Sequence, residues 1–346
     1  LGCDAVRGSA GYCPAVAVGG SYPGFLAAMM RTRYPAVVDA AYAASAPMKF
    51  YAQQLAGHEY FDRISAVAED ADAGCAAAVR STLDAVAADL EDGGPGHYRT
   101  AAERLGLCPA LPGYIADGDT FRDEILMVVA STFADHNMAY YPPRNKTELC
   151  RSCRLFRSDP GGDGSRPPHY ARLRAFLSAS VRPAPPPGSC FDLSAQLPAG
   201  PNATITSGDW SGVGTGPDGE SWDFQTCTEL VERIGFSDGS MFPPREWTYE
   251  WLRGHCARRF GVEPRPNDLV LRWGLRDLAG SGASRIIFTN GLNDGWSVGG
   301  FMEDPGPDLL VVNFTDGAHH SDLRGEDEQD SEDMQKGRMR VRNLLA

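Results

Sequence analysis

The sequence predicts an α/β protein in which a parallel β-sheet is interrupted by a long helical insertion. Short apolar runs typical of strands occur near both ends of the 346-residue chain. The middle section instead repeats apolar residues every three or four positions, which is the spacing of amphipathic helices. Strands this far apart in sequence pair side by side in layered α/β folds. We therefore expect a first part of the core over residues 1–50, an insertion over 51–200 and a second part of the core over 201–346.

The first predicted strand follows Pro14 and ends in the sequence Gly-Gly-Ser21. Helical spacing of apolar residues begins at Phe25 and stops before Pro35, so this segment is predicted to be a strand, a sharp turn and a helix. The next run, 37–46, is apolar almost throughout, which is typical of a strand buried on both faces of a parallel sheet.

Helices are predicted through the middle of the chain because apolar residues recur at helical spacing over 61–90 and 121–133. Stretches rich in proline and glycine, at 159–168 and 183–188, are predicted to be loops. Further helical patterns cover 224–234 and 247–260. Runs typical of strands return at 285–288 and 309–314, which completes the sheet.

The overall composition excludes several classes of protein. Hydrophobic residues make up 42% and charged residues 22% of the chain, which is too apolar a mixture for long-range disorder. The net charge of −13 repels phosphate backbones and anionic lipids, so neither nucleic acid nor a membrane surface is an expected partner. The longest apolar run, Ile125 to Ala130, is far shorter than the roughly 20 residues of a membrane-spanning helix.

Nine scattered cysteines indicate an oxidising compartment, because cytosolic enzymes rarely carry so many outside metal clusters. Three N-glycosylation sequons, at Asn145, Asn202 and Asn313, point the same way. The pair Cys150-x-x-Cys153 lacks a second pair at the spacing of a zinc site, so we expect no metal and no cofactor.

Three predicted strand ends carry residues suited to nucleophilic catalysis, namely Ser21, Asp294 and His319. The chain order Ser, Asp, His is that of the α/β-hydrolases, in which the serine lies on a tight turn between a strand and a helix. A hydroxyl needs an imidazole to take its proton, and the imidazole needs a carboxylate to orient it. The backbone N–H of Tyr22 is the expected oxyanion donor.

Each of these residues also has a plainer interpretation. Gly-Gly-Ser is often only a turn, and the G-x-S-x-G pattern fails here because Pro23 replaces the second glycine. Asp294 lies in a loop rich in asparagine and glycine, where aspartate usually caps its own backbone. His319 and His320 could form a surface pair or bind a metal. The placement of all three residues at strand ends favours the hydrolase interpretation.

The chain also resembles the serine peptidase family of lysosomal Pro-X carboxypeptidase and dipeptidyl peptidase II. The segments that carry the resemblance run along nearly the whole chain and are Gly19–Ala28, Tyr34–Pro35, Ala43–Pro47, Trp222–Glu229, Phe260–Pro266, Phe288–Gly291, Asp294–Ser297 and Gly317–Arg324. The resemblance implies an α/β-hydrolase core with an inserted helical cap domain. It also implies that Ser21 is the nucleophile, Asp294 the orienting carboxylate and His319 the general base, with His320 a structural neighbour.

Further roles follow from the same resemblance. Trp296 stands where the family keeps a tryptophan beside the substrate proline, and a flat indole face suits a pyrrolidine ring. Phe25 is expected to line the same pocket. The implied disulfides are Cys227–Cys256, Cys108–Cys190 and a bond from Cys75 to either Cys150 or Cys153, which leaves Cys3 and Cys13 to pair with each other or with other sequence.

Three features depart from the family pattern. Pro23 replaces a glycine, which biases Tyr22 away from the helical region. Gly295 replaces a proline after the catalytic aspartate, which loosens that loop. Only about 13 residues precede the first strand, where hydrolases of this type have further strands, so we expect the N-terminal strands of the core to be missing.

The function that this pattern predicts is that of a serine exopeptidase, of the dipeptidyl peptidase or Pro-X carboxypeptidase type. It would cleave peptides next to proline through an acyl-enzyme. The alternatives are an esterase or lipase on the same fold, and a catalytically incompetent fragment of such an enzyme. The expected partners are proline-containing peptides, with a homodimer as one option for assembly, and the expected location is the lysosome, the vacuole or the secreted fraction.

Overall fold

The structure, a computed structural model, describes residues 3–4, 7–109, 111, 115–144, 146–158, 167–180, 190–191 and 216–346. Two compact units divide the chain. The first, here called the sheet unit, comprises Leu1–Leu55, Tyr140–Pro143 and Asn267–Ala346. The second, here called the helical unit, comprises Ala56–Ala139 and Arg144–Pro266. The helical unit includes the segment up to Pro266, the last part of which packs into a small core around Cys227 and Cys256.

A parallel β-sheet forms the centre of the sheet unit, as predicted. Its strands lie in the order β1 (Val16–Gly20), β2 (Ala40–Ala44), β3 (Ile286–Gly291) and β4 (Leu309–Phe314). Every neighbouring pair is parallel, so all four carboxyl ends meet at one edge. Ligands and catalytic groups of open parallel sheets collect at that edge.

The second strand is shorter than the predicted run 37–46. Val37 lies in a turn, where its N–H donates to the carbonyl of Tyr34 at 2.9 Å, and its side chain is exposed. The strand proper starts at Ala40, because Pro35 and this turn delay the extended conformation by three residues. An apolar run alone does not distinguish such a turn from the strand that follows it.

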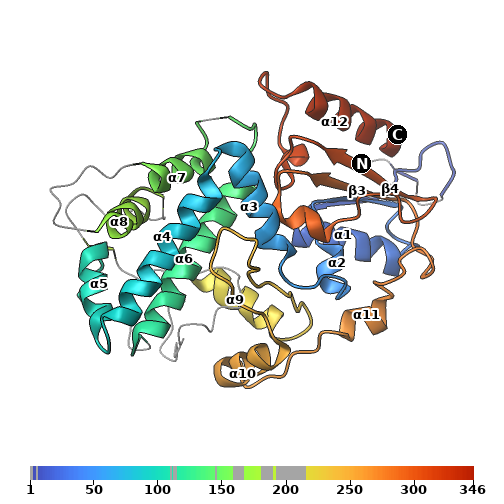
Figure 1. The fold of residues 1–346 in the computed structure, drawn as a ribbon. Coiled ribbons are helices and arrows are strands. Elements are labelled where there is room, and N and C mark those ends of the chain that lie inside the picture. The colour runs from blue at the N-terminus through green and yellow to red at the C-terminus, as the bar shows by residue number, and fades with distance from the viewer. Residues whose placement is uncertain are drawn as a thin grey trace. The chain divides into compact units, whose positions relative to one another are not determined.

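Helices cover both faces of the sheet. The first, α1 (Tyr22–Arg33), packs on β1 and β2, and α12 (Glu332–Leu345) packs on β4 from the opposite face (Figure 1). Shorter helical segments complete the unit: α2 (Met48–Tyr51), α11 (Asp268–Trp273) and the 3₁₀ turns η2 (Gly295–Gly299) and η3 (Ser321–Leu323). Both 3₁₀ turns follow strand ends, where the candidate site lies.

The helical unit is built mainly around α4, which packs against α3, α6, α7 and α8 (Figure 1). Its helices are α3 (Glu59–Ala71), α4 (Cys75–Asp92), α5 (His97–Leu105), α6 (Gly118–Met138), α7 (Glu148–Arg157), α8 (Pro168–Ala179), α9 (Gly216–Thr226) and α10 (Tyr249–Phe260). The predicted helix over 224–234 stops at Thr226, because Leu230 donates its N–H back to Gln225 and closes the last turn. Among the described helices, none is both long enough and apolar enough to cross a membrane.

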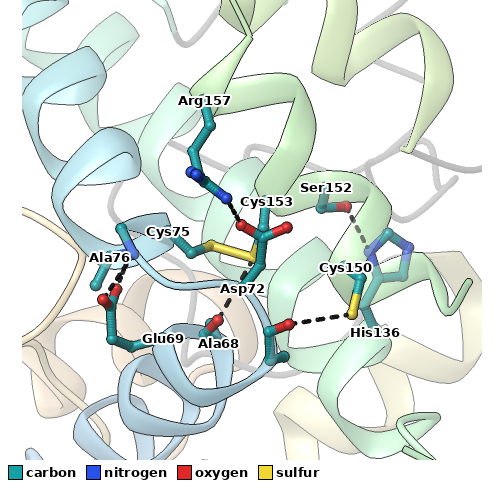
Figure 2. Close-up of a disulfide and its surroundings, with 12 residues drawn as sticks. Ala68, Glu69, Asp72, Cys75, Ala76, His136, Cys150, Ser152, Cys153 and Arg157 are labelled. Carbon is teal, nitrogen blue, oxygen red and sulfur yellow. Dashed lines mark hydrogen bonds and ion pairs between the residues drawn. A yellow bond between two sulfur atoms is a disulfide. The ribbon is translucent and has the colours of Figure 1, made fainter. Parts of the chain in front are cut away.

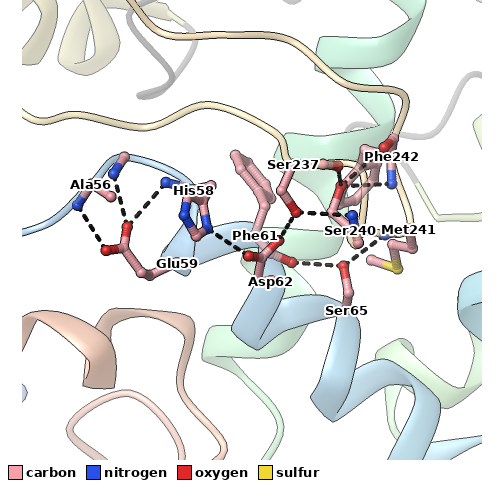
Figure 3. Close-up of polar contacts among 12 residues, drawn as sticks. Ala56, His58, Glu59, Phe61, Asp62, Ser65, Ser237, Ser240, Met241 and Phe242 are labelled. Atoms are coloured by element: carbon pink, nitrogen blue, oxygen red, sulfur yellow. Dashed lines mark hydrogen bonds and ion pairs between the residues drawn. The ribbon is translucent and has the colours of Figure 1, made fainter.

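A polar network fixes the start of α3 (Figure 3). The carboxylate of Glu59 accepts the backbone N–H groups of Ala56, Gly57 and His58 at 2.7, 2.8 and 3.0 Å. Burial acts to raise the pKa of Glu59, but these bonds to the charged form hold it below its usual value. One turn later, Asp62 accepts a 2.5 Å bond from the Ser237 hydroxyl, so the loop after α9 is tied to α3.

Candidate active site

Ser21 occupies the sharp turn between β1 and α1. Its backbone has φ 60° and ψ −131°, a conformation that side-chain-bearing residues rarely adopt and that is typical of functional turns. The Ser21 N–H donates to the Ala44 carbonyl at 2.8 Å, which anchors the turn to β2. A Cβ atom on Gly19 would lie 2.1 Å from the Pro23 carbonyl oxygen, so only glycine permits this close approach of strand and helix.

Pro23 does not prevent the turn. It lies in the first helical turn of α1, where a missing backbone N–H breaks no helical bond. Tyr22 is the first residue of α1, directly after Ser21. The N-terminal end of a helix carries partial positive charge, which suits a developing oxyanion.

Asp294 follows β3 and is completely buried. One carboxylate oxygen, Oδ1, accepts the backbone N–H of Trp296 at 3.0 Å and so caps η2. The other, Oδ2, lies 2.6 Å from Nδ1 of His319. The loop-capping and histidine-orienting interpretations of Asp294 are therefore compatible, since one carboxylate makes both contacts.

His319 lies in the loop after β4 and is also buried. The bond from its Nδ1 to Asp294 assigns Nδ1 as the protonated nitrogen, which leaves Nε2 as the acceptor for a hydroxyl proton. In the described part of the chain, no hydrogen bond joins His319 to the Ser21 hydroxyl. Such bonds are often long when no substrate is bound.

The segment 315–324, which follows β4, carries His319 and is here called the histidine loop, reaches back across the sheet to the end of β1. A Cβ atom on Gly20 would lie 2.9 Å from Cβ of His320, so the residue before Ser21 is in contact with the neighbour of His319. His320 itself adopts a left-handed conformation with φ 37°, and its N–H donates to the Ser45 hydroxyl at 2.8 Å. Burial and the charge of His319 lower the pKa of His320.

The two predicted substrate-binding aromatics occupy different surroundings. Trp296 is half-buried, with its ring centre 6.4 Å from that of His319 and 5.2 Å from that of Phe50. Phe25 is buried in the core of the sheet unit, where it packs edge-on against Tyr51 at 4.7 Å. Trp296 is therefore the aromatic side chain that adjoins the candidate catalytic residues.

The structure contains four disulfides among the described cysteines. Two are Cys227–Cys256 and Cys108–Cys190. Cys75 at the start of α4 bonds to Cys153 on α7, rather than to Cys150 one helical turn away (Figure 2). Cys3 bonds to Cys13, and Cys150 is a buried thiol that contacts the Arg144 carbonyl at 3.4 Å.

One group in the described part of the chain has the composition of a metal site. Cys227, Cys256 and His255 place a ligand atom each within 4.8 Å of one another. The two sulfurs are joined in a disulfide, and Nε2 of His255 lies 2.9 Å from Asp223. Thiolates rather than disulfides bind metals, so this group does not fit a metal ion.

Of the three sequons, Asn313 lies on β4, where its amide donates to the Met302 carbonyl and accepts from Asn290, both at 2.9 Å. Asn145 and Asn202 lie outside the described residues.

Several residues around the site had no role in the sequence analysis. Asp322 and Ser45 each belong to a segment that carries the family resemblance, yet nothing in the sequence distinguishes their side chains from ordinary polar residues. Arg338 lies on the C-terminal helix, where the sequence contains no motif that indicates a functional role. In the folded chain Ser45 and Arg338 contact the histidine loop, and Asp322 belongs to it.

A parallel sheet with a serine at a strand-to-helix turn, and a bonded Asp–His pair after two other strands, is the arrangement of the serine hydrolases built on α/β sheets. The chain matches the model of the family described as serine carboxypeptidase S28 over residues 10–341, and it belongs to that family. The resemblance noted in the sequence is thereby confirmed.

Individual relatives have low sequence identity to this chain, but their matches cover most of it. The chain is 29% identical to mouse lysosomal Pro-X carboxypeptidase and 28% identical to the human protein, over 90% of this chain in both cases. It is 26% identical to mouse thymus-specific serine protease over 96% of the chain. These matches cover 59%, 58% and 63% of the relatives, so the chain spans about three-fifths of their length.

Proposed function

We propose that this protein is a serine exopeptidase that cleaves peptides next to proline, by way of an acyl-enzyme on Ser21. The observation that carries the proposal is the buried 2.6 Å bond between His319 and Asp294, in a loop that contacts the strand end preceding Ser21. Family membership supports the reaction class, and the names of the Pro-X carboxypeptidase relatives support the preference for proline.

The chemistry assigns one task to each group. His319 Nε2 takes the hydroxyl proton as Ser21 Oγ attacks the scissile carbonyl, and Asp294 stabilises the imidazolium that forms. The Tyr22 N–H donates to the oxyanion, and one such donor typically lowers the barrier by about 2.7–4 kcal/mol. His319 then gives its proton to the leaving amine. Water hydrolyses the ester in the second half, with His319 again accepting a proton.

The aromatic side chains beside the histidine favour a proline-containing substrate. Trp296 presents an indole next to His319, and its edge-to-face contact with Phe50 fixes the ring. A pyrrolidine ring can stack on such a face at little conformational cost.

We also propose a fold assignment for each of the two units. We assign the sheet unit as an α/β-hydrolase core and the helical unit as its inserted cap. The strand β1 is the end strand of the described sheet, and Val16 and Val18, which share one of its faces, are 39% and 57% exposed. An unpaired outer edge beside an uncovered apolar face is an aggregation hazard, which supports further elements of the core on that side. Four disulfides and the names of the relatives support a lysosomal or secreted location.

The test compares wild type with Ser21→Ala and with a surface control, Ser158→Ala. Turnover is measured on reporters with proline at the second position, on peptides ending in Pro-X and on simple acyl esters. We expect wild type and the control to hydrolyse one of the proline substrates, and Ser21→Ala to lose at least about 10³-fold in kcat. Equal turnover by Ser21→Ala contradicts the proposal.

The same assay separates the alternatives. Hydrolysis of acyl esters without any cleavage of proline peptides would identify an esterase or lipase, the function that the fold alone also permits. No turnover of any substrate by folded wild-type protein would identify a catalytically incompetent fragment.

A further inference from the structure

We propose that Asp322 and Arg338 form an anchor that positions His319 for catalysis. This inference rests on the proposed function, since it assigns supporting residues to the same site. Asp322 lies three residues after His319, within η3. Among the described residues, the recorded side-chain contacts of Asp322 and Arg338 do not include Asp294.

The Asp322 carboxylate is buried and bonds to the middle of the sheet. Its Oδ2 accepts the Thr289 hydroxyl of β3 at 2.5 Å and also accepts the Tyr42 hydroxyl of β2. Burial and the nearby carboxylate raise the pKa of Tyr42, so the phenol remains a donor. Two neighbouring strands therefore hold one side chain of the histidine loop, by hydrogen bonds to a charged acceptor, which are about twice as strong as neutral ones.

Arg338 holds the backbone of the same loop from α12. Its Nε donates to the carbonyl of Asp322 at 3.1 Å and its Nη2 to the carbonyl of Ser321 at 3.0 Å. The remaining arm, Nη1, forms an ion pair with Asp330. Arg338 is 7% exposed, and its rigid planar guanidinium fixes the two carbonyls relative to each other.

Two further hydrogen bonds hold the residues on either side of His319. The Ser321 hydroxyl accepts the Ala318 N–H at 3.1 Å, and the Ser45 hydroxyl accepts the His320 N–H at 2.8 Å. His319 is thus held by its neighbours in sequence on both sides, while its ring is oriented by Asp294.

An anchor of this kind matters because the proton acceptor must lie at hydrogen-bond distance from Ser21. A displacement of about 1 Å, even from a change far from the chemistry, can cost about 10²-fold in rate. The groups that would bind the peptide lie elsewhere, on the Trp296 side of the site. Loss of the anchor should therefore lower kcat and leave KM nearly unchanged. Partial unfolding also lowers the apparent kcat at constant KM, so each rate is expressed per folded molecule, with the folded fraction measured by circular dichroism.

The experiment uses Asp322→Ala in the whole chain, with Asp304→Ala as the control. Asp304 accepts a backbone N–H, that of Val311 on β4, at 2.7 Å, but it has no recorded contact with the histidine loop. We expect Asp322→Ala, which removes the acceptor of both hydroxyl bonds, to react with a fluorophosphonate about 10²-fold more slowly, with KM for peptide changed less than about twofold. We expect the control to match wild type. A wild-type labelling rate for folded Asp322→Ala would overturn the proposal.

Milder variants keep the test valid if Asp322→Ala does not fold. Tyr42→Phe and Thr289→Val each remove one donor to the carboxylate, and we expect each to slow labelling about tenfold, a cost of the size of one hydrogen bond to a charged group. Combined with Asp322→Ala, they should add far less than their separate effects, because all three act through one contact. Wild-type rates for both single variants would contradict the anchor.

A spectroscopic measurement distinguishes failure of the anchor from failure of the proposed function. The proton shared by His319 Nδ1 and Asp294 should give a far-downfield NMR signal in wild type, whether or not the protein cleaves peptides. We expect Asp322→Ala to broaden or abolish this signal and Asp304→Ala to retain it. A sharp, unshifted signal in Asp322→Ala would overturn the anchor even if the protein had no peptidase activity.

Discussion

At the scale of single residues, the site depends on a carboxylate that performs two tasks. Asp294 caps η2 through Oδ1 and orients His319 through Oδ2. An asparagine amide can keep the first bond through its oxygen, but it presents a donor to His319 Nδ1 in place of an acceptor, which stabilises the wrong tautomer.

We therefore predict that Asp294→Asn folds normally and loses about 10⁴-fold in kcat. Circular dichroism and the melting temperature check the fold, and steady-state kinetics on the best substrate check the loss. A decrease of less than about tenfold would show that this carboxylate does not orient the catalytic base.

The turn at Ser21 has an equally local requirement. A Cβ atom on Gly19 would overlap the Pro23 carbonyl, which cannot move without displacing the start of α1. We predict that Gly19→Ala lowers the free energy of unfolding by about 1–3 kcal/mol and abolishes fluorophosphonate labelling. The control is Gly118→Ala, since a Cβ atom there meets nothing within 4 Å. Unchanged labelling of Gly19→Ala would contradict the tight turn.

His320 supplies a prediction on pH. Its pKa is lowered in the fold by burial and by the charge of His319, while Asp294 and Asp322 act in the opposite direction. The folded state therefore binds its proton more weakly than the unfolded chain, so stability is lost as the pH falls through the ordinary value of 6.5.

Replacing this histidine by a group that does not titrate should remove that loss. We predict that His320→Asn, which tolerates the left-handed backbone, reduces the drop in melting temperature between pH 7 and pH 5. Melting curves of wild type and variant at both pH values provide the measurement. Parallel pH dependence in the two proteins would refute this role of His320.

At the scale of elements, disulfides hold the helical unit together. Cys227–Cys256 closes 29 residues and joins the segment after α9 to α10, within a small core that also contains Val231 and Leu252. The chain-entropy account gives about 3–4 kcal/mol for a loop of this size and about 1 kcal/mol less for the ten-residue loop of Cys3–Cys13.

We predict that Cys227→Ser combined with Cys256→Ser destabilises the protein more than Cys3→Ser combined with Cys13→Ser. Urea unfolding of both double variants, with wild type alongside, measures the difference. An equal or reversed order would show that loop size does not set the stabilisation here.

The elements that sequence predicted best are those with an unambiguous period. The parallel strands and the amphipathic helices of the middle section follow from apolar spacing, as Phe61 and Phe133 illustrate, both buried as expected. Boundaries were harder to predict where a turn carries apolar residues, as at Val37, or where a helix ends without proline or glycine, as at Thr226. In those places the boundary of the element depends on a few backbone hydrogen bonds, which no residue type predicts.

At the scale of the whole molecule, the candidate site joins residues that are nearly 300 positions apart in the chain. The sequence predicts Ser21, Asp294 and His319 as site residues because each follows a strand and because the family motifs surround them, and their catalytic roles stay a prediction. The supporting groups could not be identified in this way. Tyr42, Thr289 and Arg338 donate hydrogen bonds to the histidine loop from β2, β3 and α12. No fixed spacing in the sequence predicts such contacts.

The most direct test of the central claim is to map the site that a fluorophosphonate modifies. The protein is labelled to completion, digested and analysed by mass spectrometry, with His319→Gln labelled in parallel. The account predicts one adduct per chain, on Ser21, and a greatly reduced rate in His319→Gln. An adduct on any other serine, or an equal rate in His319→Gln, would contradict it.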